Sequence, residues 1–153
     1  MIFDNNGNLY PHQILQTDLQ EFEAIFVTPF VNSGTRNNLF EVYLKHTFNL
    51  RTVIGNNFYQ WIDGSFVTQK QNPNDIDVVT FIDWQVHEYI EKELTVWRRS
   101  INKKMLDCYF VKVYPSTHSS YFLYENDALQ WQFQFGYNTR TRKNKGFVQL
   151  NFD

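Results

Sequence analysis

The segment Ile76–Ile82, with the sequence IDVVTFI, restricts the fold more than any other stretch of the chain. It is apolar at nearly every position, which is the pattern of a β-strand covered on both faces. Two acids, Asp75 and Asp77, nevertheless lie just before and inside this run. Because an unpaired carboxylate is costly in a buried strand, these two acids require a positively charged partner.

Helices and strands are expected to alternate along the rest of the chain. Capping residues or a helical spacing of apolar residues indicate helices at 19–27 (with Asp18 as N-cap), 38–50, 85–98 and 119–133. Further strands are expected at 58–62, 106–114 and 147–152, a hairpin or loop at 138–146, and an irregular, Asn-rich lead-in at 1–16.

This order of elements favours an α+β fold. The expected core is a mixed sheet that carries Asp75, Asp77 and Asp107 and packs against helices 38–50 and 85–98. With 153 residues, the chain is expected to form a single domain, 1–153. The aromatic fraction of 18% favours a densely packed core over exposed rings that stack on bases.

Charge and cysteine content exclude several classes of protein. The net charge of −2 gives no overall field for nucleic acid or acidic membranes, so a nucleic-acid partner is conceivable but not indicated. The single cysteine, Cys108, excludes an internal disulfide and a cysteine-built zinc site. No secretory signal is visible and no apolar run approaches the ~20 residues that span a bilayer. A soluble, cytoplasmic protein without a membrane partner is expected.

The pair Gly64–Ser65 follows the expected strand 58–62 and begins a new local element. Glycine lets the backbone turn sharply and approach a ligand, and serine is a good helix N-cap. Backbone N–H groups beside a hydroxyl form a corner that binds phosphate. The alternative is an ordinary capped turn, which an isolated Gly-Ser pair would favour.

Asp75 and Asp77 are two residues apart, so on a strand they project from the same face about 6–7 Å from each other. Two such carboxylates can bind a hard divalent cation such as Mg²⁺, which proteins hold with one or two carboxylates and the phosphates of a substrate. The alternative places Asp75 in a turn and leaves Asp77 solvated. The buried character of the strand argues against that alternative.

Together these residues resemble the signature of the DNA polymerase beta-like nucleotidyltransferase superfamily. The matching residues are Ile62–Asp63–Gly64–Ser65, a gap of nine residues, and Asp75–Ile76–Asp77–Val78. The longer run WIDGSFVT…PNDIDVV, with LDCYFV and KGFVQLNF downstream, is similar to a family of small bacterial nucleotidyltransferase-like proteins without assigned function.

The resemblance implies a function and a set of site residues. Gly64 and Ser65 would contact the phosphates of a nucleoside triphosphate, with ATP the first choice, while Asp75 and Asp77 would hold Mg²⁺. A third carboxylate is expected on a later strand, and Asp107 is the acid in that position. The reaction would be transfer of a nucleotidyl group to an unknown acceptor, which a protein partner could supply.

A second function remains open because the chain has little room for the acceptor-binding domain that many nucleotidyltransferases carry. It is a weakly catalytic or non-catalytic regulatory partner, such as the antitoxin of a toxin–antitoxin pair. Two basic clusters could neutralise phosphates or form solvated turns: Arg98, Arg99, Lys103 and Lys104, and the segment 140–145 with Arg140, Arg142, Lys143 and Lys145. Asp63 is expected to be a structural hydrogen-bond acceptor, and Asp83 a helix cap.

Overall fold

The structure is a computed structural model that describes residues 1–101 and 103–153. Its centre is a mixed sheet in the order β3-β9-β4-β5-β6, where β3–β9 and β5–β6 are parallel pairs and the other pairs are antiparallel. The strands are β3 (Ile14–Thr17), β4 (Phe58–Asp63), β5 (Ile76–Asp83), β6 (Leu106–Val113) and β9 (Phe147–Phe152). The fold is therefore α+β, as the sequence predicts.

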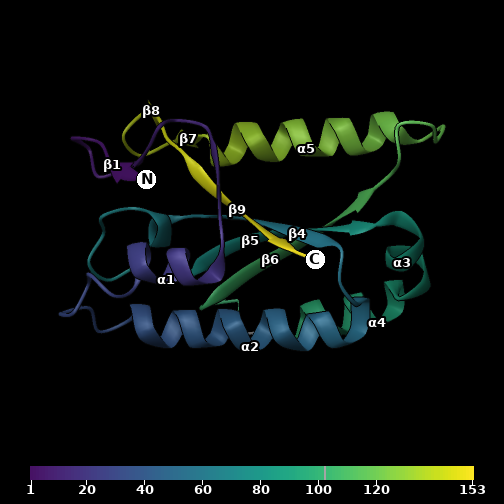
Figure 1. Cartoon of the computed structure of the whole chain (residues 1–153), viewed down its shortest axis with the longest axis horizontal. Coiled ribbons are helices and arrows are strands. Elements are labelled where there is room, and N and C mark those ends of the chain that lie inside the picture. The colour runs from purple at the N-terminus through teal and green to yellow at the C-terminus, as the bar shows by residue number, and fades with distance from the viewer. Residues whose placement is uncertain (102) are drawn as a thin grey trace.

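Helices cover both faces of this sheet (Figure 1). The elements α1 (Leu19–Phe26), α2 (Arg36–Ile54) and α4 (Glu91–Ser100) pack on one face, and α5 (Tyr121–Phe135) crosses the other. A short helix, α3 (Trp84–Tyr89), leads directly from β5 toward α4. None of the helices in the described part of the chain has the length and apolar character needed to cross a membrane.

The alternation of side chains along β5 decides where its acids point. Ile76 and Val78 belong to the core beneath α1 and α2, whereas Val79 and Phe81 belong to the core beneath α5. Because successive side chains of a strand project to opposite faces, Asp77 shares the α5 face with Val79 and Phe81. The predicted strand is thus covered on both faces, and its acid lies at the end that α5 leaves accessible.

Two short antiparallel pairs and one turn complete the structure. The pair β1 (Ile2–Phe3) and β2 (Leu9–Tyr10) lies at the N-terminus. The pair β7 (Tyr137–Asn138) and β8 (Lys143–Asn144) forms the hairpin expected at 138–146. A 3₁₀ turn, η1 (Ser65–Val67), follows β4.

Three expected elements differ from the structure. The lead-in at 1–16 was expected to be irregular, but it contains β1, β2 and most of the edge strand β3, whose partner β9 lies at the other end of the sequence. The expected helix at 85–98 is divided into α3 and α4 at Ile90, a buried residue with φ −110° and ψ 20°. The expected helix at 38–50 continues to Ile54, before Gly55. The spacing of apolar residues along the sequence predicts neither which distant strand a segment pairs with nor where packing bends a helix.

The two predicted helix caps are confirmed. The carboxylate of Asp18 accepts a hydrogen bond of 2.8 Å from the amide of Glu21. Asp83 accepts bonds of 2.9 and 3.3 Å from the amides of Gln85 and Val86. Both carboxylates therefore satisfy N–H groups that the first helical turn leaves without a partner.

Candidate functional site: an aspartate-lined cleft

Three aspartates lie side by side on neighbouring strands. Asp63 is the last residue of β4, and its Cα partner on β5 is Asp77. Asp77 in turn pairs with Asp107 on β6. Paired residues on adjacent strands share a face with Cβ atoms about 4.5–5.5 Å apart, so the sheet carries a row of three carboxyl groups. Asp75, just before β5, lies close enough for its charge to act on Asp77.

Gly64 adopts a backbone conformation that favours glycine, with φ +83° and ψ −168°. A Cβ atom added at this residue would lie 2.0 Å from Oδ2 of Asp77. The glycine therefore serves two purposes: it allows the turn at the end of β4, and it leaves the space that the Asp77 carboxylate occupies.

Ser65 does not act as a helix N-cap in the way the sequence suggests. Gly64 holds the capping position, and the element that follows is a single 3₁₀ turn, Ser65–Val67. A phosphate corner here would therefore depend on the turn itself and on the Ser65 side chain, because one turn has only a weak dipole. The carbonyl of Ser65 accepts hydrogen bonds from the amide and the hydroxyl of Thr68, at 3.3 and 2.8 Å.

Lys145 is the positively charged partner of the row. Its ammonium Nζ donates to both carboxylate oxygens of Asp63, at 2.8 and 2.6 Å, and both side chains are buried. Burial raises the pKa of Asp63 to about 6, while the Lys145 charge and hydrogen bond act against that rise. The predicted structural role of Asp63 as an acceptor is thus confirmed, and the acceptor site is an ion pair.

Among the ion pairs found in the described part of the chain, Asp77 has none comparable to that of Asp63. Burial, together with the negative charges of Asp75, Asp63 and Asp107, raises the pKa of Asp77 to about 7, while the charge of Lys145 acts against that rise. A carboxyl group whose ionised form is disfavoured by burial and by neighbouring carboxylates is stabilised by any cation that binds beside it.

Asp107 is in the predicted place but is also used locally. It pairs with Asp77 in the sheet register, and its Oδ2 accepts a 2.9 Å hydrogen bond from the hydroxyl of Tyr109. The guanidinium of Arg98 lies over the ring of Tyr109 at 4.8 Å. Among the residues that the structure describes, no group of three or more His, Cys, Asp or Glu side chains is arranged to hold a metal ion. Whether Asp107 joins Asp75 and Asp77 on one cation stays a prediction.

A polar cleft of about 940 Å³ opens beside the row. Asp63, Gly64, Ser65, Asp75 and Asp77 all line it, whereas Asp107 is not among its lining residues. The opposite rim comes from the β7–β8 hairpin and from the N-terminal loop between β1 and β2. A cleft of this size has room for a small polar ligand such as a nucleotide.

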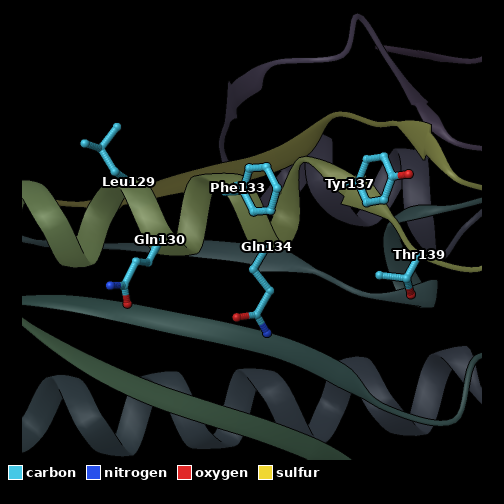
Figure 2. A pocket seen from close by; sticks show the side chains of 6 residues that line it. All are labelled: Leu129, Gln130, Phe133, Gln134, Tyr137 and Thr139. Atoms are coloured by element: carbon cyan, nitrogen blue, oxygen red, sulfur yellow. The ribbon is translucent and has the colours of Figure 1, made fainter.

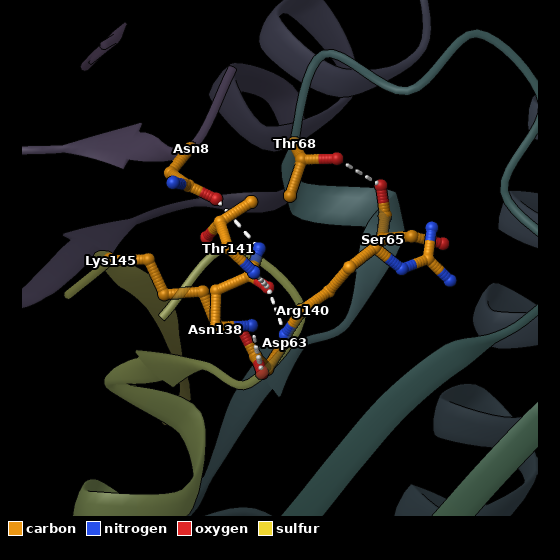
Figure 3. A network of polar contacts seen from close by, with 8 residues as sticks. All are labelled: Asn8, Asp63, Ser65, Thr68, Asn138, Arg140, Thr141 and Lys145. Carbon is orange, nitrogen blue, oxygen red and sulfur yellow. Dashed lines mark hydrogen bonds and ion pairs between the residues drawn. The ribbon is translucent and has the colours of Figure 1, made fainter. Parts of the chain in front are cut away.

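Hydrogen bonds tie the two rim segments together (Figure 3). The side-chain carbonyl of Asn138 accepts from the amides of Arg140 and Thr141, each at 3.1 Å, and its side-chain amide donates to Asn8 at 3.0 Å. The N-terminal loop is also joined to the far wall, since the amide of Gln69 donates to the carbonyl of Gly7 at 2.9 Å.

Arg36 holds the segment 66–70, which follows Gly64 and forms one wall of the cleft. This arginine is completely buried and donates to the carbonyls of Phe26, Phe66, Thr68 and Lys70 at 2.6 to 2.8 Å. Its guanidinium also lies over the ring of Phe30 at 3.7 Å. Burial lowers the pKa of Arg36 to about 10, so the group remains charged at neutral pH. The segment 66–70 is therefore held at its carbonyl groups by one side chain.

The cations of the basic segment 140–145 have different surroundings. Arg140 lines the cleft, Arg142 and Lys143 are exposed, and Lys145 is the buried partner of Asp63. Lys145 was only one of several cations in the sequence. Its role depends on β9 lying beside β4, which brings the residues just before β9 next to the end of β4. No local signal indicates that strand pairing, and the same is true of the contacts between Arg36 and its carbonyl partners.

The fold and the site together define a class: an α+β domain with a mixed sheet whose aspartates line a polar cleft at one end of the strands. The chain belongs to a family of unknown function (DUF6932), whose model matches residues 1–151. No curated protein and no solved structure matches the chain.

Proposed function

We propose that the protein is a Mg²⁺-dependent nucleotidyltransferase that moves a nucleotidyl group from a nucleoside triphosphate, ATP being the first choice, to an acceptor with a nucleophilic oxygen. The observation that carries this proposal is the position of the Asp77 carboxylate. It lies against Gly64 in a row of acids, beside the Ser65 turn and inside a polar cleft.

The residues present fit the cation. Mg²⁺ prefers oxygen ligands and is held by one or two carboxylates together with substrate phosphates, and Asp75 and Asp77 offer such carboxylates at the mouth of the cleft. When bound, Mg²⁺ would neutralise phosphate charge and stabilise the charge that develops during transfer. The elevated pKa of Asp77 agrees with this assignment, because a bound cation would offset both the burial and the neighbouring negative charges that disfavour the ionised carboxylate.

The chain's own groups would position the triphosphate. Ser65 and the turn that begins there offer a hydroxyl and backbone amides, and Arg140 offers a guanidinium suited to bidentate contact with phosphate. Lys145 is committed to Asp63, so its contribution is to hold that acid ionised and in place. Chemistry of this kind depends on positioning and charge neutralisation and needs no histidine base. A nucleoside triphosphate substrate agrees with the cytoplasmic location that the sequence suggests.

Calorimetric titration tests the proposal. ATP and the other nucleoside triphosphates are titrated into the protein with Mg²⁺ and then with EDTA. Binding is expected only with Mg²⁺, and it should be lost in Asp77→Asn. Asp83→Asn, which alters an acid used as a helix cap, is the matched control and should bind as the wild type does. Absence of binding for every triphosphate would refute the proposal.

One observation favours the second candidate, a weakly catalytic or non-catalytic regulatory partner. The carboxylate of Asp107 accepts a hydrogen bond from Tyr109 and does not line the cleft, so a site of two carboxylates would be left. Such a protein would bind Mg²⁺ and nucleotide but would transfer little or nothing. Incubation with triphosphate labelled at the α-phosphate separates the two candidates, because only the enzyme transfers label to an acceptor.

A further inference from the structure

The outer side of α5 carries an apolar stripe that is interrupted by the exposed residue Asn126. Phe122, Leu129 and Phe133 are 57%, 62% and 79% exposed. Their spacing places them on one face of the helix, opposite the side that packs on the sheet. Leu123 and Tyr137 extend the stripe at its two ends. The solvent side of a surface helix is normally polar, so this face has the character of an interface.

The C-terminal half of the stripe borders a shallow groove of about 550 Å³ (Figure 2). Leu129 points away from the sheet, and Gln130 and Gln134 extend from the helix toward it (Figure 2). Gln134, Tyr137 and Thr139 line both this groove and the aspartate cleft. Whatever covers the stripe would therefore also form part of the cleft entrance.

The length of the stripe argues against a small ligand. At a rise of 1.5 Å per residue, the segment from Phe122 to Phe133 extends over roughly 16 Å, and it is a convex helix face, whereas small-molecule sites are concave. The face of a second helix matches this length and shape.

The distribution of charge matches a second copy of the same helix. Glu125 and Asp127 are the acids of α5, and both lie in its N-terminal half. Residues 128–139 contain no charged side chain, and the exposed cations Arg140, Arg142 and Lys143 follow. In an antiparallel pair, the acidic end of each helix would lie beside the basic end of the other. A parallel pair would bring like charges together.

The exposed area is sufficient for such a pair. With aromatic side chains contributing about 150–250 Å² each, the five residues of the stripe present on the order of 500 Å² per copy. Two copies would bury about 1,000 Å², which is the lower limit of a specific interface. An interface at this limit is expected to be weak, so the dimer should form in a concentration-dependent way.

We propose that α5 is the interface of a homodimer in which two copies pack antiparallel, with Leu129 of one copy against Phe133 of the other. The partner helix then forms part of the entrance to each aspartate cleft. This arrangement does not depend on the proposed function, and it is tested without nucleotide.

Sedimentation velocity over a range of concentrations provides the first test. The wild type is expected to form a dimer, and the double variant Leu129→Gln, Phe133→Gln to sediment as a monomer with an unchanged circular dichroism spectrum. Tyr89→Gln, which removes an apolar side chain that is 89% exposed on α3, is the control and should dimerise normally. A monomeric wild type at all concentrations, or a dimeric double variant, would overturn the proposal.

Cross-linking with a short bis-maleimide tests the orientation and needs no destabilising change. The native Cys108 is buried, so a single introduced cysteine is the reactive one. In the antiparallel pair, Gln130→Cys lies near the two-fold axis and should cross-link, whereas the two copies of Ser119→Cys lie more than about 30 Å apart and should not. Cross-linking of both variants would indicate parallel packing, and cross-linking of neither would exclude this interface; each result contradicts the proposal.

Discussion

Replacing Gly64 by alanine tests the geometry on which the site depends. Two costs are expected. First, alanine at φ +83° and ψ −168° occupies a region that is essentially reserved for glycine, which costs about 1–3 kcal/mol. Second, the new methyl group meets Oδ2 of Asp77 at 2.0 Å, so the carboxylate must move. Overpacking of this kind adds about 1–3 kcal/mol.

Gly55 provides a matched control. It has φ +76° and ψ −155°, close to the conformation of Gly64, but nothing lies within 4 Å of an added Cβ atom. Gly55→Ala therefore carries the backbone cost without the clash. It should lower the free energy of unfolding by about 1–2 kcal/mol after the reduced entropy of the unfolded chain is taken into account. Gly64→Ala should lower it by about 2–5 kcal/mol.

Urea unfolding followed by tryptophan fluorescence measures these differences, and a double-mutant cycle identifies their source. In an Asp77→Ala background the carboxylate is absent, so the extra cost of Gly64→Ala over Gly55→Ala should disappear. Mg²⁺-dependent nucleotide binding should be lost in Gly64→Ala and retained in Gly55→Ala. Equal stabilities for the two glycine variants, or no coupling between Gly64 and Asp77, would refute the reasoning.

Three further predictions concern the acids and Arg36. Asp107→Asn should abolish or severely weaken Mg²⁺-dependent transfer without lowering the stability of the metal-free protein. Asp83→Asn should cost at most ~1–2 kcal/mol of stability and leave transfer intact. Transfer of labelled nucleotide and urea unfolding measure both effects. In EDTA, the wild type should lose stability as pH rises from about 4 to 7, because the folded pKa of Asp77 is about 7 against 3.8 and its ionised form is disfavoured. Asp77→Asn should lose less over this range, since only the raised pKa of Asp63 remains, and should be more stable than the wild type by about 2 kcal/mol at pH 8 in urea titrations. Arg36→Met should lower the free energy of unfolding by at least about 4 kcal/mol, because it leaves buried carbonyl groups without a hydrogen-bond donor. A variant as stable as the wild type in thermal unfolding would contradict the role of Arg36 as the anchor of these carbonyls.

The strands that carry the acids could be predicted because their signal is local. The apolar run Ile76–Ile82 is long enough to identify a covered strand, and two-residue periodicity then places Asp77 on one face of it. Asp75 was expected on that same face, but it lies just before β5. Asp107 follows from its place inside the next strand, and the register confirms that it is the neighbour of Asp77. The helix caps Asp18 and Asp83 were accessible for the same reason, since a cap acts within three residues.

The parts of the cleft that sequence reasoning missed all depend on distant pairing. Asn8 lies in a segment expected to be irregular, yet its side chain accepts a hydrogen bond from Asn138. Lys145 reaches Asp63 because the chain entering β9 arrives next to the end of β4. Arg36 lies in the first turn of α2, and its carbonyl partners lie at the end of α1, in η1 and in the segment that follows η1. Neither periodicity nor a short motif contains this information.

The aspartate row is an arrangement that the fold maintains at a cost. Four carboxyl groups lie near the adjoining ends of β4, β5 and β6, and Lys145 forms its ion pair with Asp63. In the free protein, burial and the charges of the neighbouring acids both disfavour the ionised form of Asp77 and raise its pKa. The opposing contributions come from far along the sequence: Arg36 anchors the wall after Gly64, and Lys145 anchors the end of β4. A cation bound by Asp75 and Asp77 would reverse the sign of the row's contribution to stability. Ligand binding and folding are therefore coupled at this site, and Mg²⁺ should raise the midpoint of thermal unfolding in the wild type more than in Asp77→Asn.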